Sequence, residues 1–202
     1  MAVKIKPIAE GAESKIYEAE IFGIDALVKA REPKPYRVKE LDEFLRESRT
    51  RKEARLLLAA RRAGASVPSL MSFGKFEIYM QKLDGILLRD ILQDSPCNIF
   101  EKAGGELAKL HKAGIAHGDY TPANILVKAD KVYVIDFGLS EFTNSIEERA
   151  IDVLLMKRSI SKKQYSCFLK GYAKYSQSTA VLDRLAKIEK RGRYQTRTLS
   201  TL

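Results

Sequence analysis

The sequence HGDYTPANILVKADKVYVIDFG, at residues 117–138, decides the fold of this chain. Within it, two short apolar runs, Ile125–Val127 and Val132–Ile135, predict a pair of strands with a turn at Asp130. Two carboxylates and one carboxamide flank this strand pair. We expect these three groups to converge in one cleft.

The order and spacing of these polar residues resemble the catalytic loop and the metal-binding Asp-Phe-Gly motif of protein kinases. Phosphoryl transfer needs in-line positioning, cations on the phosphate oxygens and a group that orients the acceptor. Oxygen ligands suit the hard Mg²⁺ ion, with Mn²⁺ as a substitute, so Asn124 and Asp136 are expected to be metal ligands. Asp119 is expected to orient the incoming hydroxyl or water and to accept its proton. The alternative is that Asp119 and Asn124 only cap turns.

Residues next to these motifs have expected supporting roles. His117 is expected to brace the loop against Phe137 and to take no direct part in catalysis. Gly118 stands where ordinary protein kinases carry an arginine that binds a phosphorylated activation loop, and only fourteen residues lead from Gly138 to Asp152. A full activation segment does not fit in that length. Asp152 is expected to anchor the backbone of the catalytic loop, unless it is a plain surface acid.

The predicted architecture is an α+β, bilobal protein-kinase-like fold, minimal in size and without a full activation segment. We divide it into a strand-rich lobe at 1–83, a helical lobe at 84–191 and a basic flexible tail at 192–202. The first lobe is predicted to contain three strands at Val3–Ile8, Lys15–Ile21 and Asp25–Lys29. A long helix at Lys39–Ala63 and two further strands within Phe73–Leu83 are predicted to follow. Helices of the second lobe are predicted at Ile99–Lys112, Ser145–Ser159, Ser161–Lys174 and Ala180–Arg191.

Lys29 occupies the place of the kinase lysine on the third strand and is expected to bind the α- and β-phosphates of a nucleotide. A carboxylate on the long helix is expected to hold it toward the nucleotide. Glu53 is the preferred partner because it lies deep in the apolar part of the helix, and Glu47 is the competing candidate. The expected catalytic residues are therefore Asp119, Lys29 and Glu53.

The loop between the first two strands stands where a glycine-rich loop would cover the phosphates. It contains one glycine, so its backbone amides are a weaker signal than the usual pattern. Met80–Leu83 is the expected hinge, which would offer backbone hydrogen bonds to adenine. The expected nucleotide-binding residues are Gly11, Ala12, Glu13, Ser14, Lys15, Lys29, Met80, Gln81 and Leu83.

The composition is that of a globular chain: 45% of the residues are hydrophobic, 31% are charged, and the net charge is +10. The basic excess favours polyanionic partners, or it simply keeps the surface soluble. No apolar run is long enough for a membrane span, and the first residues do not resemble a signal peptide. The two cysteines, Cys97 and Cys167, are expected to be free buried thiols in a reducing compartment.

The whole chain resembles the small atypical serine/threonine kinase of the KEOPS complex, the PRPK-type family, in its archaeal-like form. The resemblance rests on HGDYTPANIL and IDFGLS together with GAES, RTRKEARLL and KRGRYQTR. It implies a cytoplasmic serine/threonine kinase or ATPase that uses ATP. It also implies, as partners, an ASKHA-fold subunit that makes threonylcarbamoyl-adenosine in tRNA and the other KEOPS subunits.

The C-terminal segment of nineteen residues, 184–202, carries six basic side chains against one acid and could contact tRNA or lie over the nucleotide site. Tyr194 and Gln195 interrupt its basic run, and a plain solvated face is the alternative.

Three other functions compete with this interpretation. A small-molecule kinase of the aminoglycoside or choline type also uses an HGD loop, but it normally carries a helical insert that is missing here. The Asp-Phe-Gly motif at 136–138 and the short chain count against a RIO-type kinase. The last alternative is a non-catalytic scaffold that binds tRNA or a partner, which would not need Lys29, Asp119, Asn124 and Asp136 together.

Overall fold

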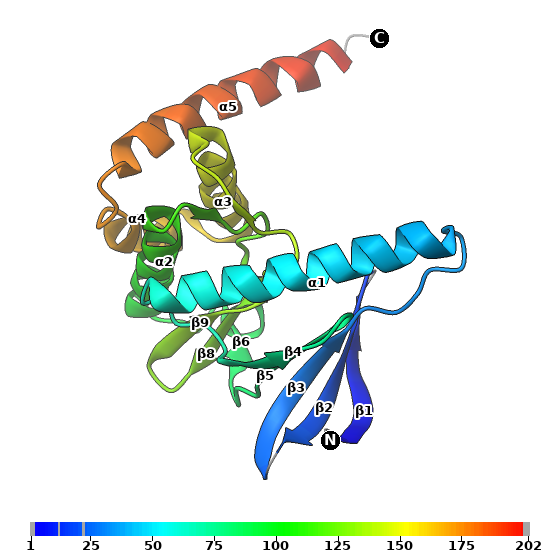
Figure 1. The fold of residues 1–202 in the computed structure, drawn as a ribbon. Helices are drawn as coiled ribbons and strands as arrows, with labels where there is room; N and C mark the ends of the chain where they lie inside the picture. The colour runs from blue at the N-terminus through cyan, green and yellow to red at the C-terminus, as the bar shows by residue number, and fades with distance from the viewer. Residues whose placement is uncertain (1–2, 12, 22, 200–202) are drawn as a thin grey trace.

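The structure is a computed structural model and describes residues 3–11, 13–21 and 23–199. Figure 1 shows a strand-rich part and a helix-rich part, with one long helix running across both. Five antiparallel strands form the first sheet in the order β1-β2-β3-β5-β4. These strands are β1 (Val3–Glu10), β2 (Lys15–Ile21), β3 (Ile24–Ala30), β4 (Leu70–Phe73) and β5 (Glu77–Gln81).

Helix α1 (Lys39–Arg62) links the sheet to the rest of the molecule. Its sequence is rich in Arg, Glu, Leu and Ala, which are strong helix formers. The apolar side chains Leu56, Leu57 and Ala60 lie in the same hydrophobic core cluster as Phe100 and Leu107 of the helical part. Burying each large aliphatic side chain contributes about 2 kcal/mol, so α1 is held firmly against that core.

The helical part is built around the quoted motif. Strands β8 (Ile125–Lys128) and β9 (Lys131–Val134) pair antiparallel with Lys128 opposite Lys131, so the turn is at Ala129-Asp130 as predicted. Strand β6 (Ile86–Leu87) joins the other side of β8. The remaining elements are η1 (Leu88–Ile91), α2 (Cys97–Lys112), β7 (Ile115–Ala116), η2 (Pro122–Asn124), β10 (Glu141–Phe142), α3 (Ile146–Ser159), α4 (Lys162–Tyr172) and α5 (Ser178–Leu199).

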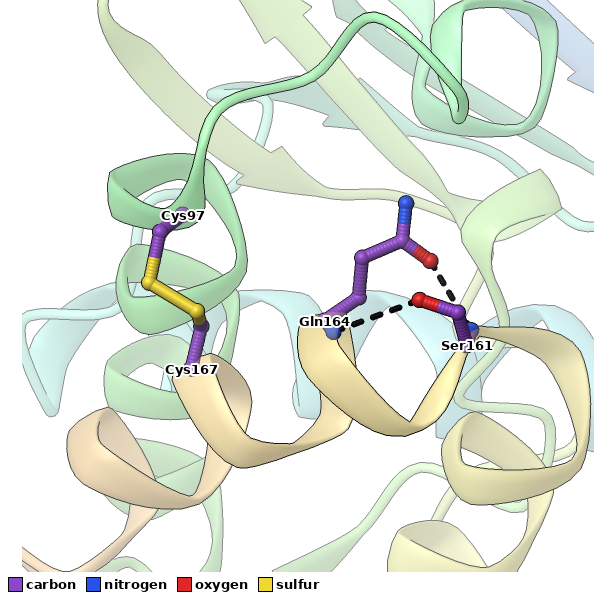
Figure 2. Close-up of a disulfide and its surroundings, with 4 residues drawn as sticks. All are labelled: Cys97, Ser161, Gln164 and Cys167. Carbon is purple, nitrogen blue, oxygen red and sulfur yellow. Dashed lines mark hydrogen bonds between the residues drawn. A yellow bond between two sulfur atoms is a disulfide. The ribbon is translucent and has the colours of Figure 1, made fainter.

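The expectation of free cysteines is wrong: Cys97 and Cys167 form a disulfide between the first residue of α2 and α4 (Figure 2). The two helices approach closely along their length, because a Cβ at Gly171 would lie 1.8 Å from the carbonyl oxygen of Glu101. This packing brings together cysteines that are 70 residues apart in sequence. No short-range pattern marks such a pair.

The expectation for the end of the chain also differs from the structure. Residues 192–199 continue helix α5, which extends to Leu199, whereas irregular backbone was expected from residue 192 onward. Residues 200–202 lie outside the described part of the chain. Along that described part, every helix is too short or too polar to cross a bilayer.

The disulfide predicts that reduction lowers the free energy of unfolding. Closing a loop of 70 residues restricts the unfolded chain, which corresponds to a stabilisation of about 4 kcal/mol. Urea unfolding with and without dithiothreitol measures the loss. The double variant Cys97→Ala/Cys167→Ala is the control, because its unfolding should not respond to the reductant. Identical curves for the unmodified protein under both conditions would contradict the assignment.

Candidate active site

Lys29 on β3 joins two carboxylates that come from distant parts of the chain. Its Nζ atom lies 2.7 Å from Oε1 of Glu53 on α1 and 2.7 Å from Oδ1 of Asp136, which follows β9. The predicted choice of Glu53 is therefore confirmed. Glu47, the competing candidate, forms an ion pair with Arg51.

Asp136 has a backbone conformation that few residues other than glycine adopt, with φ at 62°. This conformation places its carboxylate where Oδ1 accepts both from Lys29 and from the N–H of Gly138, at 3.0 Å. Burial acts to raise the pKa of Asp136, but the charge and hydrogen bond of Lys29 outweigh it, so the pKa is lowered from its ordinary value. Asp136 is therefore an anion at neutral pH.

Asn124, at the end of η2, is bonded to Asp119. Its amide nitrogen donates to the Asp119 carbonyl oxygen at 2.9 Å and to Oδ2 of the same residue at 2.8 Å. Both N–H groups of the amide are thus in use, and the amide oxygen is the atom that Asn124 retains for a cation. The same bonds fix the orientation of the Asp119 carboxylate.

Asp152 on α3 anchors the loop backbone, as the sequence predicts. Its Oδ2 accepts from the N–H of His117 at 2.7 Å, and its Oδ1 accepts from the N–H of Gly118 at 2.8 Å. The imidazole of His111 on α2 also contacts Oδ2, at 3.1 Å, and lies 2.7 Å from the hydroxyl of Tyr172 on α4. Sequence reasoning missed His111 and Tyr172, because nothing local connects them to the loop.

The expected bracing of the loop by His117 is confirmed. Its ring lies 5.2 Å from the ring of Phe137, centroid to centroid, and its Nε2 lies 3.2 Å from the carbonyl oxygen of Ile135. Burial lowers the pKa of His117 from its ordinary value, so the ring is neutral. A neutral ring can donate to Ile135 through Nε2 and accept from the N–H of Asp119 through Nδ1, at 3.3 Å.

Gly118 has no room for the arginine that ordinary kinases carry there. Its φ is 79°, and a Cβ would lie 2.5 Å from the carbonyl oxygen of Leu139. The loop therefore packs directly against the segment that follows the Asp-Phe-Gly motif. Any side chain at this position would force the two segments apart.

A cavity of about 280 Å³ lies beside Lys29 and receives residues from both parts of the molecule. The predicted hinge residues Met80, Gln81 and Leu83 line it, as do Asn124 and Asp136. Much of its surface is apolar, which suits a planar base. Sequence reasoning missed the apolar residues, although strand alternation was available as a signal for most of them: Ala9, Ile16, Leu27, Ile78, Leu87 and Leu126.

The loop expected to cover the phosphates is a tight turn, in which the N–H of Gly11 donates to the carbonyl oxygen of Ser14 at 2.9 Å. Glu13 is turned away toward Arg49 of α1, with which it forms an ion pair. Lys15 pairs with Glu32 at 3.0 Å, which together with Glu10 raises the pKa of Lys15. None of these residues lines the described cavity, and Ala12 lies outside the described residues. Their contact with phosphate stays a prediction.

The donor set fits a magnesium ion that is shared with substrate. Asn124 offers an amide oxygen and Asp136 a carboxylate, and both line the same cavity. Over residues 3–11, 13–21 and 23–199, no group of three or more His, Cys, Asp or Glu side chains could hold a metal ion. Mg²⁺ is commonly bound through one or two protein oxygens, waters and substrate phosphates, so this small donor set is sufficient.

This chain is similar to a known domain family and to several named proteins. The RIO domain family matches residues 15–173. The KEOPS complex subunit Bud32 of Pyrococcus abyssi is 36% identical over 98% of this chain and 100% of its own length. A probable serine/threonine-protein kinase BUD32 homolog of Archaeoglobus fulgidus is 37% identical over 91% of this chain and 92% of its own.

A third relative is longer than this chain. The probable bifunctional tRNA threonylcarbamoyladenosine biosynthesis protein of Methanobrevibacter smithii is 35% identical over 93% of this chain. This chain spans only 36% of that relative.

Solved structures with the same fold include two kinase-like proteins. WaaP in complex with acyl carrier protein aligns with a TM-score of 0.68, covering 94% of this chain and 88% of WaaP at 18% identity. The Rio2 kinase of Chaetomium thermophilum aligns with a TM-score of 0.66, covering 92% and 70% at 18% identity. The predicted protein-kinase-like fold is confirmed. The motif at 136–138 and the short chain were expected to count against a RIO-type kinase; that expectation is wrong, because the RIO domain family matches residues 15–173, which include this motif.

The two buried histidines predict how stability depends on pH. Burial lowers the pKa of His111 and of His117 below the ordinary 6.5. As pH falls through 6.5, the unfolded chain binds protons that the folded chain does not, so the free energy of unfolding decreases. Above pH 6.5 their contribution is fully present. Below it, the loss approaches about 1.4 kcal/mol per pH unit for each histidine until the pH passes the lowered pKa of the folded chain.

Urea unfolding at intervals from pH 8 to pH 5 measures this slope. In the control variant His111→Asn/His117→Asn the slope between pH 6.5 and pH 5 should be largely absent. A flat profile for the unmodified protein over that interval would show that the rings are not buried in the neutral form.

Proposed function

Because this chain belongs to the RIO-domain family and, within it, to the Bud32 proteins, we propose that it is an ATP-dependent phosphotransferase that acts as a serine/threonine protein kinase, as an ATPase, or as both. One observation carries the proposal. Lys29 is bonded to Glu53 and Asp136 at an apolar cavity that Asn124 also lines. This arrangement of charges supports binding of a nucleoside triphosphate.

The adenine base occupies the apolar part of the cavity. The N–H of Gln81 already donates to the carbonyl oxygen of Ser69, and that of Lys82 donates to Asp25. Leu83, which lines the cavity, is therefore the hinge residue that we assign to bond the base. Lys29 binds the α- and β-phosphates as a positive point charge held in place by Glu53.

Asn124 and Asp136 are the side chains that would hold Mg²⁺, or Mn²⁺ as a substitute. The bound ion supplies positive charge against the phosphate oxygens. Asp119 accepts the proton of the acceptor hydroxyl or water through the carboxylate oxygen that Asn124 does not occupy. The loop that carries Asp119 is held in position by two hydrogen bonds from its backbone N–H groups to the carboxylate of Asp152.

The names of the relatives support the proposed partners. Only a short segment, with β10 as its one strand, separates Gly138 from α3, so no long activation segment cradles a peptide. We assign the chain to a KEOPS complex, as the Pyrococcus abyssi relative is named. The longer relatives are named for tRNA threonylcarbamoyladenosine biosynthesis, which favours a partner with that activity. We propose that this partner is the ASKHA-fold subunit implied by the resemblance to the KEOPS kinase. ATP hydrolysis or phosphorylation by this chain would support that modification.

We place the protein in the cytoplasm, where tRNA is modified. The disulfide is compatible with this placement in hyperthermophilic archaea, whose intracellular proteins are rich in disulfides. The basic end of the chain, residues 192–202, is assigned to tRNA or to the partner, because its cations suit phosphate groups. The lobes at 1–83 and 84–191 act as the two sides of the nucleotide cleft.

Magnesium-dependent ATP turnover tests the proposed function. Asp119→Ala should lower kcat by about 100-fold or more, because the acceptor loses its orienting base. Asp136→Ala should abolish metal-dependent turnover, because it removes a ligand of the ion and a partner of Lys29.

Asp130→Ala is the matched control, since Asp130 is an exposed acid in the turn between the two motifs and contacts Asn98 and Lys102. Its turnover should stay close to that of the unmodified protein. Equal turnover by the Asp119→Ala variant and the unmodified protein would contradict the enzyme assignment and favour a binding scaffold.

A further inference from the structure

Glu53 is held by a second cation besides Lys29. Arg31 follows the end of β3, two residues after Lys29, so the two side chains leave the chain on the same face. Nη2 of Arg31 lies 2.5 Å from Oε2 of Glu53, while Nζ of Lys29 lies 2.7 Å from Oε1. Each carboxylate oxygen therefore has its own cation.

Arg31 also contacts the helix that carries Glu53 at a second point. Its Nη1 donates to the hydroxyl of Thr50 at 3.3 Å, and Thr50 lies one turn before Glu53 on the same face of α1. The N–H of Arg31 donates to the carbonyl oxygen of Phe76 at 2.9 Å, which ties its backbone to the residue that precedes β5. Arg31 thus connects the sheet to two successive turns of α1.

These contacts are shielded from water, since Arg31 is 5% exposed and Glu53 is 4% exposed. A buried charge is costly unless it is paired, and a buried ion pair is seldom the cheapest way to stabilise a fold. Apolar side chains further along α1 already hold the helix in the core. The buried Arg31 is therefore explained by its effect on the position of Lys29, with which it shares the Glu53 carboxylate.

The charges around Lys29 show what Arg31 changes. Lys29 faces two carboxylates, Glu53 and Asp136, and either can draw its ammonium group. With one oxygen bound to Arg31, Glu53 has a fixed position and only one oxygen directed at Lys29. Lys29 is then held at the point where β3, α1 and Asp136 meet.

We propose that Arg31 is a positioning residue for phosphoryl transfer, which fixes Glu53 so that Lys29 is aimed at the phosphates. The proposal rests on the proposed function. Glu53 does not depend on a swing of α1 to reach Lys29, because Arg31 and the core packing hold the helix in the paired position. A purely structural Arg31 would stabilise the fold without affecting turnover by folded molecules.

A double-mutant cycle separates these roles. Turnover is measured per folded molecule for the unmodified protein, Arg31→Met, Glu53→Gln and the combination of both. Arg31→Met should lower kcat by about tenfold, with the KM for ATP changed by less than about threefold, because a misplaced Lys29 costs alignment more than binding. In the Glu53→Gln background the same substitution should have almost no further effect, since Arg31 acts through Glu53.

Two further variants complete the test. Arg31→Lys keeps the charge but not the fork, so kcat should recover only in part, and this variant carries the test if Arg31→Met does not fold. Arg51→Met is the matched control: Arg51 is another arginine, two residues before Glu53 on α1, and its exposed side chain forms its ion pair with Glu47. Its kcat should stay within about threefold of the unmodified value.

The outcomes also distinguish this proposal from the proposed function. If the unmodified protein shows no turnover that depends on Asp119, the proposed function fails and this proposal fails with it. If turnover is present but Arg31→Met leaves kcat per folded molecule unchanged, only this proposal fails. It fails equally if the effects of Arg31→Met and Glu53→Gln simply multiply.

Discussion

The ion contacts of Lys29 are the constraint on which the site depends. One ammonium group on β3 lies 2.7 Å from a carboxylate of α1 and 2.7 Å from Asp136, which follows β9. It therefore joins the sheet, the long helix and the second lobe at a single point. Glu53 and Asp136 are placed next to each other because both contact this ammonium group. Because α1 also packs its apolar residues into the core of the helical part, this junction is held by apolar burial as well as by ion pairs.

The other half of the site is built from the backbone of the catalytic loop. Asp152 accepts hydrogen bonds from two N–H groups of this loop, and the imidazole of His111 contacts the same carboxylate. The absence of a side chain at Gly118 lets the loop lie against the segment after the Asp-Phe-Gly motif. An ordinary kinase fixes this region through a phosphorylated activation loop and an arginine. In this chain, buried hydrogen bonds hold the loop.

Much of the site could be predicted from sequence, and what was missed has a physical reason. The pairing of Lys29 with Glu53 follows from their place on a strand and on a helix, because local periodicity fixes which face each side chain occupies. The disulfide between Cys97 and Cys167 depends on tertiary packing, which leaves no local pattern. Arg31 was missed because an arginine beside a strand usually faces solvent, and only the packing of α1 buries it.

The central claim is that Asn124 and Asp136 hold a divalent cation while Lys29 contacts the phosphates. The most direct test is a crystal structure with a non-hydrolysable ATP analogue and Mn²⁺, in which anomalous scattering locates the metal. The account predicts a metal peak bonded to the amide oxygen of Asn124 and to the carboxylate of Asp136, with Lys29 on a phosphate oxygen. A metal peak out of bonding distance of both side chains would contradict it.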